Sequence, residues 1–169
     1  IALSAMGANV LGVDVSGPML ARARSRDASL EYQQADAATT DFARAFDLVF
    51  SRFGVMFFDD PTAAFKNLYN ALKPGGRLLF VCWQPPAVNP WMATAGRAIA
   101  PYLPPSDEAP NPRAPGPFAL ADPRYVEQIL QDAGFSEIQI NAHEESLKVA
   151  DTLAEAVQFQ TRVGPAARV

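Results

Sequence analysis

The sequence predicts an α/β protein with a mostly parallel sheet and helices on both faces. Two short apolar runs, 46–50 and 77–83, have the composition of strands that are buried on both faces. Between them, Asp60 and Pro61 suit a helix start, because aspartate caps helices and proline needs no N–H in the first turn. Apolar residues recur at helical spacing at Phe65, Leu68, Tyr69 and Leu72. A Pro-Gly-Gly segment at 74–76 then ends the helix, so strand, helix and strand form a right-handed βαβ unit.

Before this unit the sequence predicts a helix end, two strands and a connecting helix. Residues 1–6 suit the end of a helix, and a strand is expected at 9–14. A second strand, at 30–34, alternates in polarity and is expected near a sheet edge. The connecting helix has its expected cap, first-turn proline and inner-face residues at Ser16, Pro18, Met19 and Leu20.

After the second apolar run the composition changes. Residues 101–123 hold eight of the fifteen prolines, which excludes regular helix and central strand there. We expect helices to begin at Asn89, Asp122 and Asp151, and a half-exposed strand at 138–142, where apolar and polar residues alternate. The inner face of the second helix is expected at Val126, Ile129, Leu130 and Ala133, and that of the last at Leu153, Ala156, Val157 and Gln160.

The bulk composition is that of a folded domain rather than a nucleic-acid or membrane protein. With 169 residues, of which 49% are hydrophobic, the chain can build one core. Its net charge is −4 and its basic residues are scattered, so a nucleic-acid groove is not expected. No apolar run has the length of a transmembrane helix. Cys82 is the single cysteine and is expected to be a buried thiol, so we expect a cytoplasmic protein without disulfides.

Both ends of the sequence suggest a truncated chain. The first residue is Ile1, within an alanine-rich segment that suits the end of a helix, and the chain stops at Val169 without a terminal element. We therefore expect a fragment of a longer protein.

Three of the predicted strands are followed by polar side chains. Asp14 ends the first, Asp36 follows the second, and Ser51 with Arg52 ends the third. Ligands of open parallel sheets bind beyond the carboxyl ends of the strands, and an acid there can accept both hydroxyls of a nucleotide ribose. A nucleotide cofactor is therefore expected, although Asp14 could instead be a helix-start charge and Asp36 a turn residue.

Two motifs extend this expectation to a family. Phe-Asp-Leu-Val at 46–49 and Leu-Lys-Pro-Gly-Gly-Arg-Leu at 72–78 resemble the fourth strand and the approach to the fifth strand of class I S-adenosylmethionine (SAM)-dependent methyltransferases. The resemblance covers about 1–83 well and the rest loosely. It implies a Rossmann-like fold and methyl transfer from S-adenosyl-L-methionine to a small molecule. The aromatic residues Trp91, Tyr102 and Phe118 favour a fairly apolar acceptor.

The same resemblance implies roles at the strand ends. In the family, the acid after the second strand holds the ribose, and two apolar residues beyond it flank the adenine. The acid-alanine pair after the third strand reads the adenine edge. The loop after the fourth strand lines the methionine end of SAM and the acceptor; here its Phe57 and Phe58 could surround a sulfonium or could instead pack in the core. The implied cofactor-binding residues are Asp14, Val15, Met19, Asp36, Ala37, Ser51 and Arg52.

The resemblance also implies a division of the chain. We expect a SAM-binding core at 1–83, a proline-rich cap at 84–122 and an incomplete C-terminal part of the same domain at 123–169. The glycine-rich motif of the family, which follows its first strand, is not in this sequence. The strands at 9–14 and 46–51 should flank that first strand, so the fragment should either leave a slot between them of roughly 10 Å or close up by pairing the two edges wrongly. The fragment alone is expected to bind SAM weakly and to be inactive.

Two other functional classes fit parts of the sequence. A nicotinamide-dependent oxidoreductase would also place an acid at Asp14, and a non-catalytic binding fragment would need no acceptor site. The Pro-Gly-Gly segment favours the methyltransferase. The single histidine, His143, is expected on the surface or in packing, with a general-base role as the alternative. The sequence shows no metal-ligand pattern, and it leaves the catalytic residues, the acceptor and the oligomeric state open.

Overall fold

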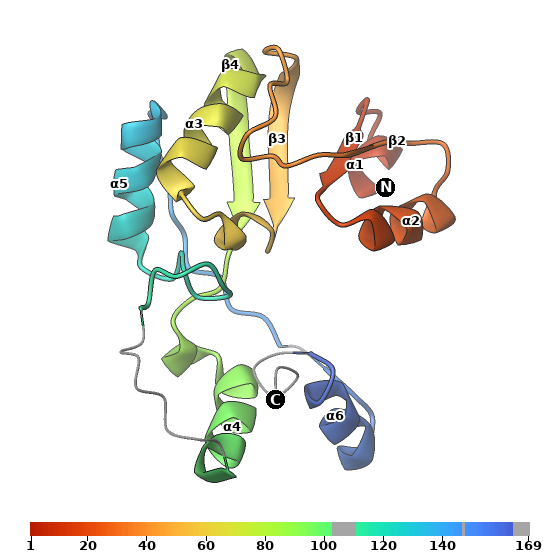
Figure 1. Ribbon diagram of the computed structural model, residues 1–169, viewed down its shortest axis with the longest axis vertical. Coiled ribbons are helices and arrows are strands. Elements are labelled where there is room, and N and C mark those ends of the chain that lie inside the picture. The colour runs from red at the N-terminus through yellow and green to blue at the C-terminus, as the bar shows by residue number, and fades with distance from the viewer. Residues whose placement is uncertain (103–110, 147, 164–169) are drawn as a thin grey trace. The chain divides into compact units, whose positions relative to one another are not determined.

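The structure of the protein, a computed structural model, describes residues 1–102, 111–146 and 148–163 (Figure 1). The helices and strands are α1 (Ala2–Ala5), β1 (Leu11–Asp14), α2 (Gly17–Arg26), β2 (Glu31–Gln34), β3 (Phe46–Arg52), η1 (Val55–Phe57), α3 (Pro61–Ala71), β4 (Leu72–Val81), η2 (Pro86–Val88), α4 (Pro90–Ile99), η3 (Ala100–Tyr102), α5 (Pro123–Ala133) and α6 (Leu153–Gln160). None of the helices in these ranges has the length and apolar character needed to span a membrane.

The chain divides into two compact units. The first consists of Ile1–Phe50, Asp60–Leu79 and Ile129–Ser136, and the second of Ser51–Asp59, Phe80–Gln128 and Glu137–Val169. The division of the chain into a core at 1–83, a cap at 84–122 and a C-terminal part at 123–169 stays a prediction.

Strands β1 and β2 form a parallel pair in the first unit. Leu11 lies opposite Glu31 and Asp14 opposite Gln34, so both strands end at the same edge. The connecting helix α2 begins as predicted, because the Ser16 hydroxyl accepts a hydrogen bond from the N–H of Met19 and proline occupies the first turn. Only Leu20 of this helix is buried.

Strands β3 and β4 form the second pair, and both run in the same direction in Figure 1. Helix α3 connects them and begins where predicted, with the Asp60 carboxylate accepting from the N–H of Ala63 at 3.0 Å. The predicted apolar stripe is confirmed: Phe65 has no exposed surface and Leu68 is 5% exposed. Tyr69 continues the stripe onto Phe135, 5.2 Å away between ring centroids, and the two residues place α3 beside the end of α5.

Strands β1 and β3 belong to different two-stranded sheets and are not paired with each other. This agrees with the predicted strand order. The expectation that the 46–50 and 77–83 runs are buried on both faces was wrong for the structure described. Leu48 and Phe50 are 40% and 46% exposed, and Leu79 and Val81 of the paired strand are 56% and 44% exposed. Each pair has period-two spacing and therefore lies on one face of its strand, so one face of β3 and β4 is half-buried and the other is open.

Helix α5 confirms the predicted inner face. Asp122 precedes the helix, and its side chain accepts from the N–H of Arg124 at 2.9 Å. Gly134 ends the helix with φ of +100°, a conformation that favours glycine. All four predicted inner-face residues, Val126, Ile129, Leu130 and Ala133, are at most 6% exposed.

The remaining segments differ from the sequence-based expectation in two places. Strand β4 begins at Leu72, so the Pro-Gly-Gly segment lies inside the extended strand rather than before it. Pro74 disfavours helical backbone at the residue before it, Lys73, which is consistent with extended backbone on this side of the proline. No strand is formed at 138–142 within the described part of the chain, because these residues pair with no other strand. Of the two alternatives for Phe57, core packing does not hold, since its side chain is 49% exposed, whereas its neighbours Val55 and Met56 are buried.

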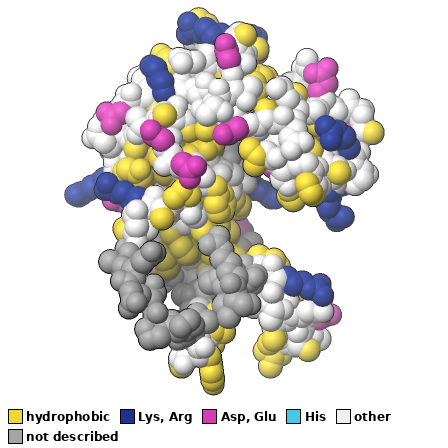
Figure 2. Space-filling view, in the orientation of Figure 1, with side chains coloured by type: hydrophobic (Ala, Val, Ile, Leu, Met, Phe, Trp, Pro, Cys, Tyr) yellow, Lys and Arg dark blue, Asp and Glu magenta, His cyan; other side chains and the backbone are white. Residues whose placement is uncertain are grey.

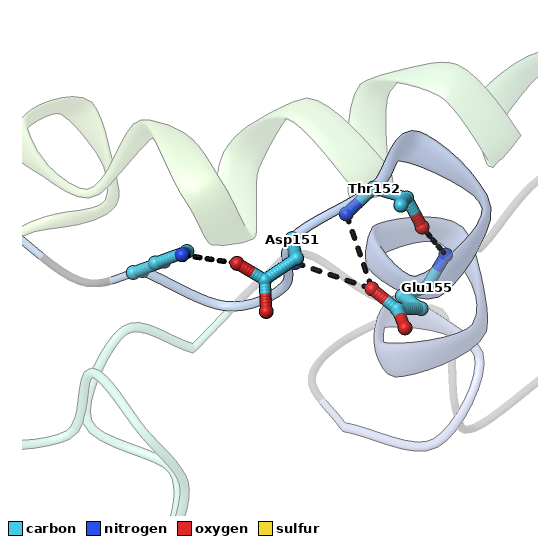
Figure 3. A network of polar contacts seen from close by, with 4 residues as sticks. Asp151, Thr152 and Glu155 are labelled. Carbon is cyan, nitrogen blue, oxygen red and sulfur yellow. Dashed lines mark hydrogen bonds and ion pairs between the residues drawn. The ribbon is translucent and has the colours of Figure 1, made fainter.

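The helix ends of the second unit also differ in detail. Asn89 precedes α4, but its side-chain amide donates to the carbonyls of Gln84 and Pro85 and does not cap the helix. The cap of α6 is Thr152 rather than Asp151 (Figure 3). The Thr152 hydroxyl accepts from the N–H of Glu155, and the Glu155 carboxylate accepts from the N–H groups of Thr152 and Asp151.

The expected inner face of α6 is not buried. Leu153 and Val157 are 81% and 57% exposed. Figure 2 shows hydrophobic side chains among the charged groups on one face of the molecule.

We predict that Phe65→Ala lowers the free energy of unfolding by about 3–5 kcal/mol, because it leaves a cavity around a fully buried ring. Urea unfolding followed by circular dichroism measures the change. Phe57→Ala is the matched control, since that ring is 49% exposed, and it should cost less than about 1 kcal/mol. Equal losses for the two variants would contradict the assignment of Phe65 to the core.

We predict that Thr152→Ala destabilises α6 by about 1 kcal/mol through loss of the capping box. Hydrogen exchange of the α6 amides should accelerate accordingly. Asp151→Ala is the control: its carboxylate pairs with Lys148 at the surface, where ion pairs contribute little, and its own N–H bond to Glu155 is kept. Faster exchange in Asp151→Ala than in Thr152→Ala would show that the cap is wrongly assigned.

Candidate cofactor site

The ends of β1 and β2 bring two predicted site acids to one edge. Asp14 is the last residue of β1, and Asp36 lies two residues beyond the end of β2. The parallel pairing continues past the strands, because the N–H of Ala35 donates to the carbonyl of Asp14 at 3.1 Å. Since both strands end at the same edge, the two carboxylates belong to one end of this sheet.

Asp14 is half-buried and is held by the start of the next helix. One carboxylate oxygen, Oδ1, accepts from the N–H of Ser16 at 2.8 Å. The Ser16 hydroxyl in turn accepts from the N–H of Met19 at 3.3 Å. The local sequence therefore fixes the acid on a rigid turn, because each side chain satisfies an N–H that the helix leaves without a partner.

Two apolar side chains beside Asp14 are exposed. Val15 is 65% and Met19 is 61% exposed. The expectation that Met19 faces inward was therefore wrong, because Leu20 occupies the buried position of α2. Gln34 holds this segment to β2, since its side-chain amide donates to the Val15 carbonyl at 3.0 Å. In such an arrangement the carboxylate can accept hydrogen bonds from ribose hydroxyls, and the two apolar side chains can contact a flat base.

Asp36 opens a tight turn. Its Oδ1 accepts from the N–H of Ala38 at 2.8 Å, and its carbonyl accepts from the N–H groups of Thr39 and Thr40. Within residues 1–102, the N–H of Ala37 donates to no protein group. The turn therefore presents a carboxylate and a neighbouring backbone donor, which is the combination needed to read a donor-acceptor edge.

Sequence reasoning missed the residue that holds this turn. Asn67 of α3 donates from Nδ2 to the carbonyls of Ala37 and Thr40, at 3.0 and 2.8 Å. The two bonds join residues far apart in the sequence, so no local pattern identifies them. In the sequence, the one indication is that Asn67 lies between the buried residues Phe65 and Leu68, so that its side chain is half-buried.

Ser51 and Arg52 lie at the carboxyl end of β3, in the second unit. Ser51 is half-buried and Arg52 is exposed. Beyond them, Phe53 donates from its N–H to the carbonyl of Val81 at 2.9 Å and has a φ of +61°. The joint action of these residues with the strand ends of the first unit stays a prediction.

An aromatic cluster in the second unit was also missed. Phe53 stacks on Trp83 at 4.2 Å between ring centroids, and Trp83 meets Trp91 edge-on at 5.4 Å. Phe159 of α6 completes the cluster at 6.5 Å from Trp91, and Gln160 donates to the Trp91 carbonyl at 3.0 Å. Two buried polar atoms, Trp91 Nε1 and Gln160 Oε1, have no partner among the described residues.

The remaining candidates, His143 and Cys82, are not placed in a catalytic or metal-binding arrangement among the described residues. His143 is exposed, with Nε2 3.8 Å from the Glu145 carboxylate, as expected for a surface histidine. Cys82 lies just after β4, half-buried, with Sγ 3.4 Å from the Leu120 carbonyl. Across 1–102, 111–146 and 148–163, no cluster of three histidine, cysteine or acidic residues is arranged to hold a metal ion.

Comparison with known proteins gives consistent matches. Residues 1–80 match a family model described as a methyltransferase domain. Phosphoethanolamine N-methyltransferase 1 of Triticum aestivum is 31% identical over 137 residues, which are 77% of this chain and 24% of that protein. Demethylmenaquinone methyltransferase of Thermus thermophilus is 41% identical over 87 residues, 48% of this chain and 40% of that protein.

A solved structure agrees with these matches. Phosphoethanolamine N-methyltransferase 2 of Haemonchus contortus, in complex with phosphomonomethylethanolamine and S-adenosylhomocysteine, aligns with a TM-score of 0.53 and 27% identity. The alignment covers 79% of this chain and 29% of that structure. The chain therefore spans between 24% and 40% of the length of these relatives.

The fold and the strand-end acids define a Rossmann-like α/β protein with parallel strands. Within that class, residues 1–80 match a methyltransferase domain, and the chain is similar to a methyltransferase solved in complex with S-adenosylhomocysteine.

We predict that Cys82 reacts slowly with iodoacetamide in the folded protein, because burial raises the pKa of its thiol above the usual value. The neutral thiol then persists to higher pH in the folded than in the unfolded chain. The contribution of the neutral Cys82 thiol to the free energy of unfolding is full below the ordinary thiol pKa. It is lost as the pH rises through the raised pKa of the folded protein. Alkylation rates at pH 8 in buffer and in urea measure the effect, and equal rates would contradict it.

Proposed function

We propose that the protein transfers a methyl group from S-adenosyl-L-methionine to a small-molecule acceptor. The observation that carries the proposal is the pair of acids at one end of the β1–β2 sheet, within the residues that match the methyltransferase domain. SAM, when bound, supplies an electrophilic methyl group. The task left to the protein is to bind the cofactor, align the acceptor and exclude water.

The residues of the first unit fit the nucleoside part of this cofactor. Asp14 has one carboxylate oxygen on the Ser16 N–H and offers acceptor capacity for ribose hydroxyls. Val15 and Met19 present apolar surface suited to a base. Asp36 and Ala37 combine an acceptor with a backbone donor, which matches the N6 amine and N1 atom of adenine.

The second unit carries the residues proposed for the other end of the cofactor and for the acceptor. We assign Ser51 and Arg52 to the methionine end, at the carboxyl end of β3. The cluster of Phe53, Trp83 and Trp91 supports a fairly apolar acceptor. The named relatives act on phosphoethanolamine and demethylmenaquinone, which differ widely in polarity, so they do not single out one acceptor for this chain.

The oxidoreductase alternative shares the acid at the end of β1 but has no support in the family match. The cap at 84–122 is proposed to cover the acceptor, and its residues 103–110 lie outside the described part of the chain. The cytoplasmic location expected from the composition stays a prediction.

We predict that Asp14→Asn weakens SAM binding by about 1.5–3 kcal/mol, the range of a hydrogen bond to a charged group. Asparagine keeps an acceptor for the Ser16 N–H, so the turn should persist. Calorimetry on the complete protein measures the affinity. Asp47→Asn is the control, because that carboxylate pairs at the surface with Lys73. Wild-type affinity in Asp14→Asn would remove Asp14 from the site.

A further inference from the structure

Asn67 is the one side chain of α3 that bonds to the turn after β2 among the hydrogen bonds of the described residues. Both of its partners are carbonyl oxygens, so the bonded atom must be the amide NH₂ group. Ala37 and Thr40 stand at the two ends of the turn. One amide group therefore holds both ends of the turn against the same helix.

The helix itself is a rigid support. Its N-terminus is capped by Asp60, and the flanking core residues Phe65 and Leu68 are 0% and 5% exposed. The turn also has internal bonds, from Thr39 and Thr40 to the Asp36 carbonyl. These internal bonds close the turn, and the Asn67 bonds hold the closed turn against the core, so both sets of bonds protect it.

We propose that Asn67 is a positioning residue of the cofactor site, which places the carboxylate of Asp36 and the N–H of Ala37 against the adenine edge. The inference rests on the proposed function. Asn67 touches the turn and not the cofactor, so it acts through the two carbonyls. Hydrogen bonds to a base edge require donor-acceptor distances near 2.9 Å, and a small displacement of the turn weakens both at once.

The test compares two ligands that differ only at the adenine edge. S-adenosylhomocysteine presents an N6 donor and an N1 acceptor, and S-inosylhomocysteine presents an oxygen and an N1–H, which reverses the pattern. The wild-type protein should prefer the adenine ligand. Asn67→Asp replaces the NH₂ donor by a carboxylate that repels both carbonyls, and should bind S-adenosylhomocysteine about tenfold more weakly. The ratio of the affinities of Asn67→Asp for S-adenosylhomocysteine and S-inosylhomocysteine should therefore be smaller than that of the wild-type protein.

Asn70→Asp is the matched control, with the same substitution on an exposed position of the same helix. It should leave both affinities and their ratio unchanged. If Asn67→Asp weakens both ligands equally, the ratio of the two affinities is unchanged. Asn67 would then have a merely structural role, and the inference would be overturned. All variants are made in the complete protein. If the complete wild-type protein binds neither ligand, the proposed function itself fails, whereas wild-type binding with an unchanged ratio in Asn67→Asp overturns the Asn67 inference alone.

Hydrogen exchange of the unliganded protein gives a second measurement. In Asn67→Leu, the amides of Thr39 and Thr40 should exchange faster, while those in the middle of α3 keep their protection. Unchanged exchange in the turn would overturn the proposal without any ligand, and loss of protection throughout α3 would assign Asn67 to the core instead.

Discussion

The burial of one face of α3 is the constraint on which the first unit depends. Phe65 has no exposed surface, and Tyr69 packs on Phe135 beyond the end of α5. Apolar contacts of this kind fix the rotation of the helix about its axis, because any rotation would expose the ring to water. The same rotation directs Asn67 toward the turn after β2. Packing in the core and the geometry of the candidate site are therefore set together.

The candidate site also shows where exposure of apolar groups is consistent with function. Val15 and Met19 are mostly exposed next to a carboxylate held on a capped turn. Single exposed apolar side chains are common on protein surfaces. Here they adjoin the end of a parallel strand pair, where ligands of such sheets bind. On β3, the exposed side chains of Leu48 and Phe50 lie on the same face as Arg52, which is proposed for the methionine end of the cofactor.

Two helix starts and the inner face of α5 could be read from the sequence because their causes are local. Ser16 and Asp60 cap the helices predicted for them, and the stripe of α5 is buried at every predicted position. Asp151 and Thr152 can both cap a helix, and the reciprocal bond with Glu155 decided for Thr152. That choice was also local, and the glutamate three residues beyond Thr152 was a readable signal.

By itself, the sequence determined the parallel strand pairs, the acids at their ends and the resemblance to methyltransferases. These follow from side-chain periodicity and from chemistry at fixed offsets along the chain. The tertiary structure decided which side of α2 is buried, leaving Met19 exposed, and whether residues 138–142 find a strand partner. It also placed Asn67 against the turn at Ala37 and Thr40. Such contacts join distant residues, and their energy depends on how the core packs, which no local pattern contains.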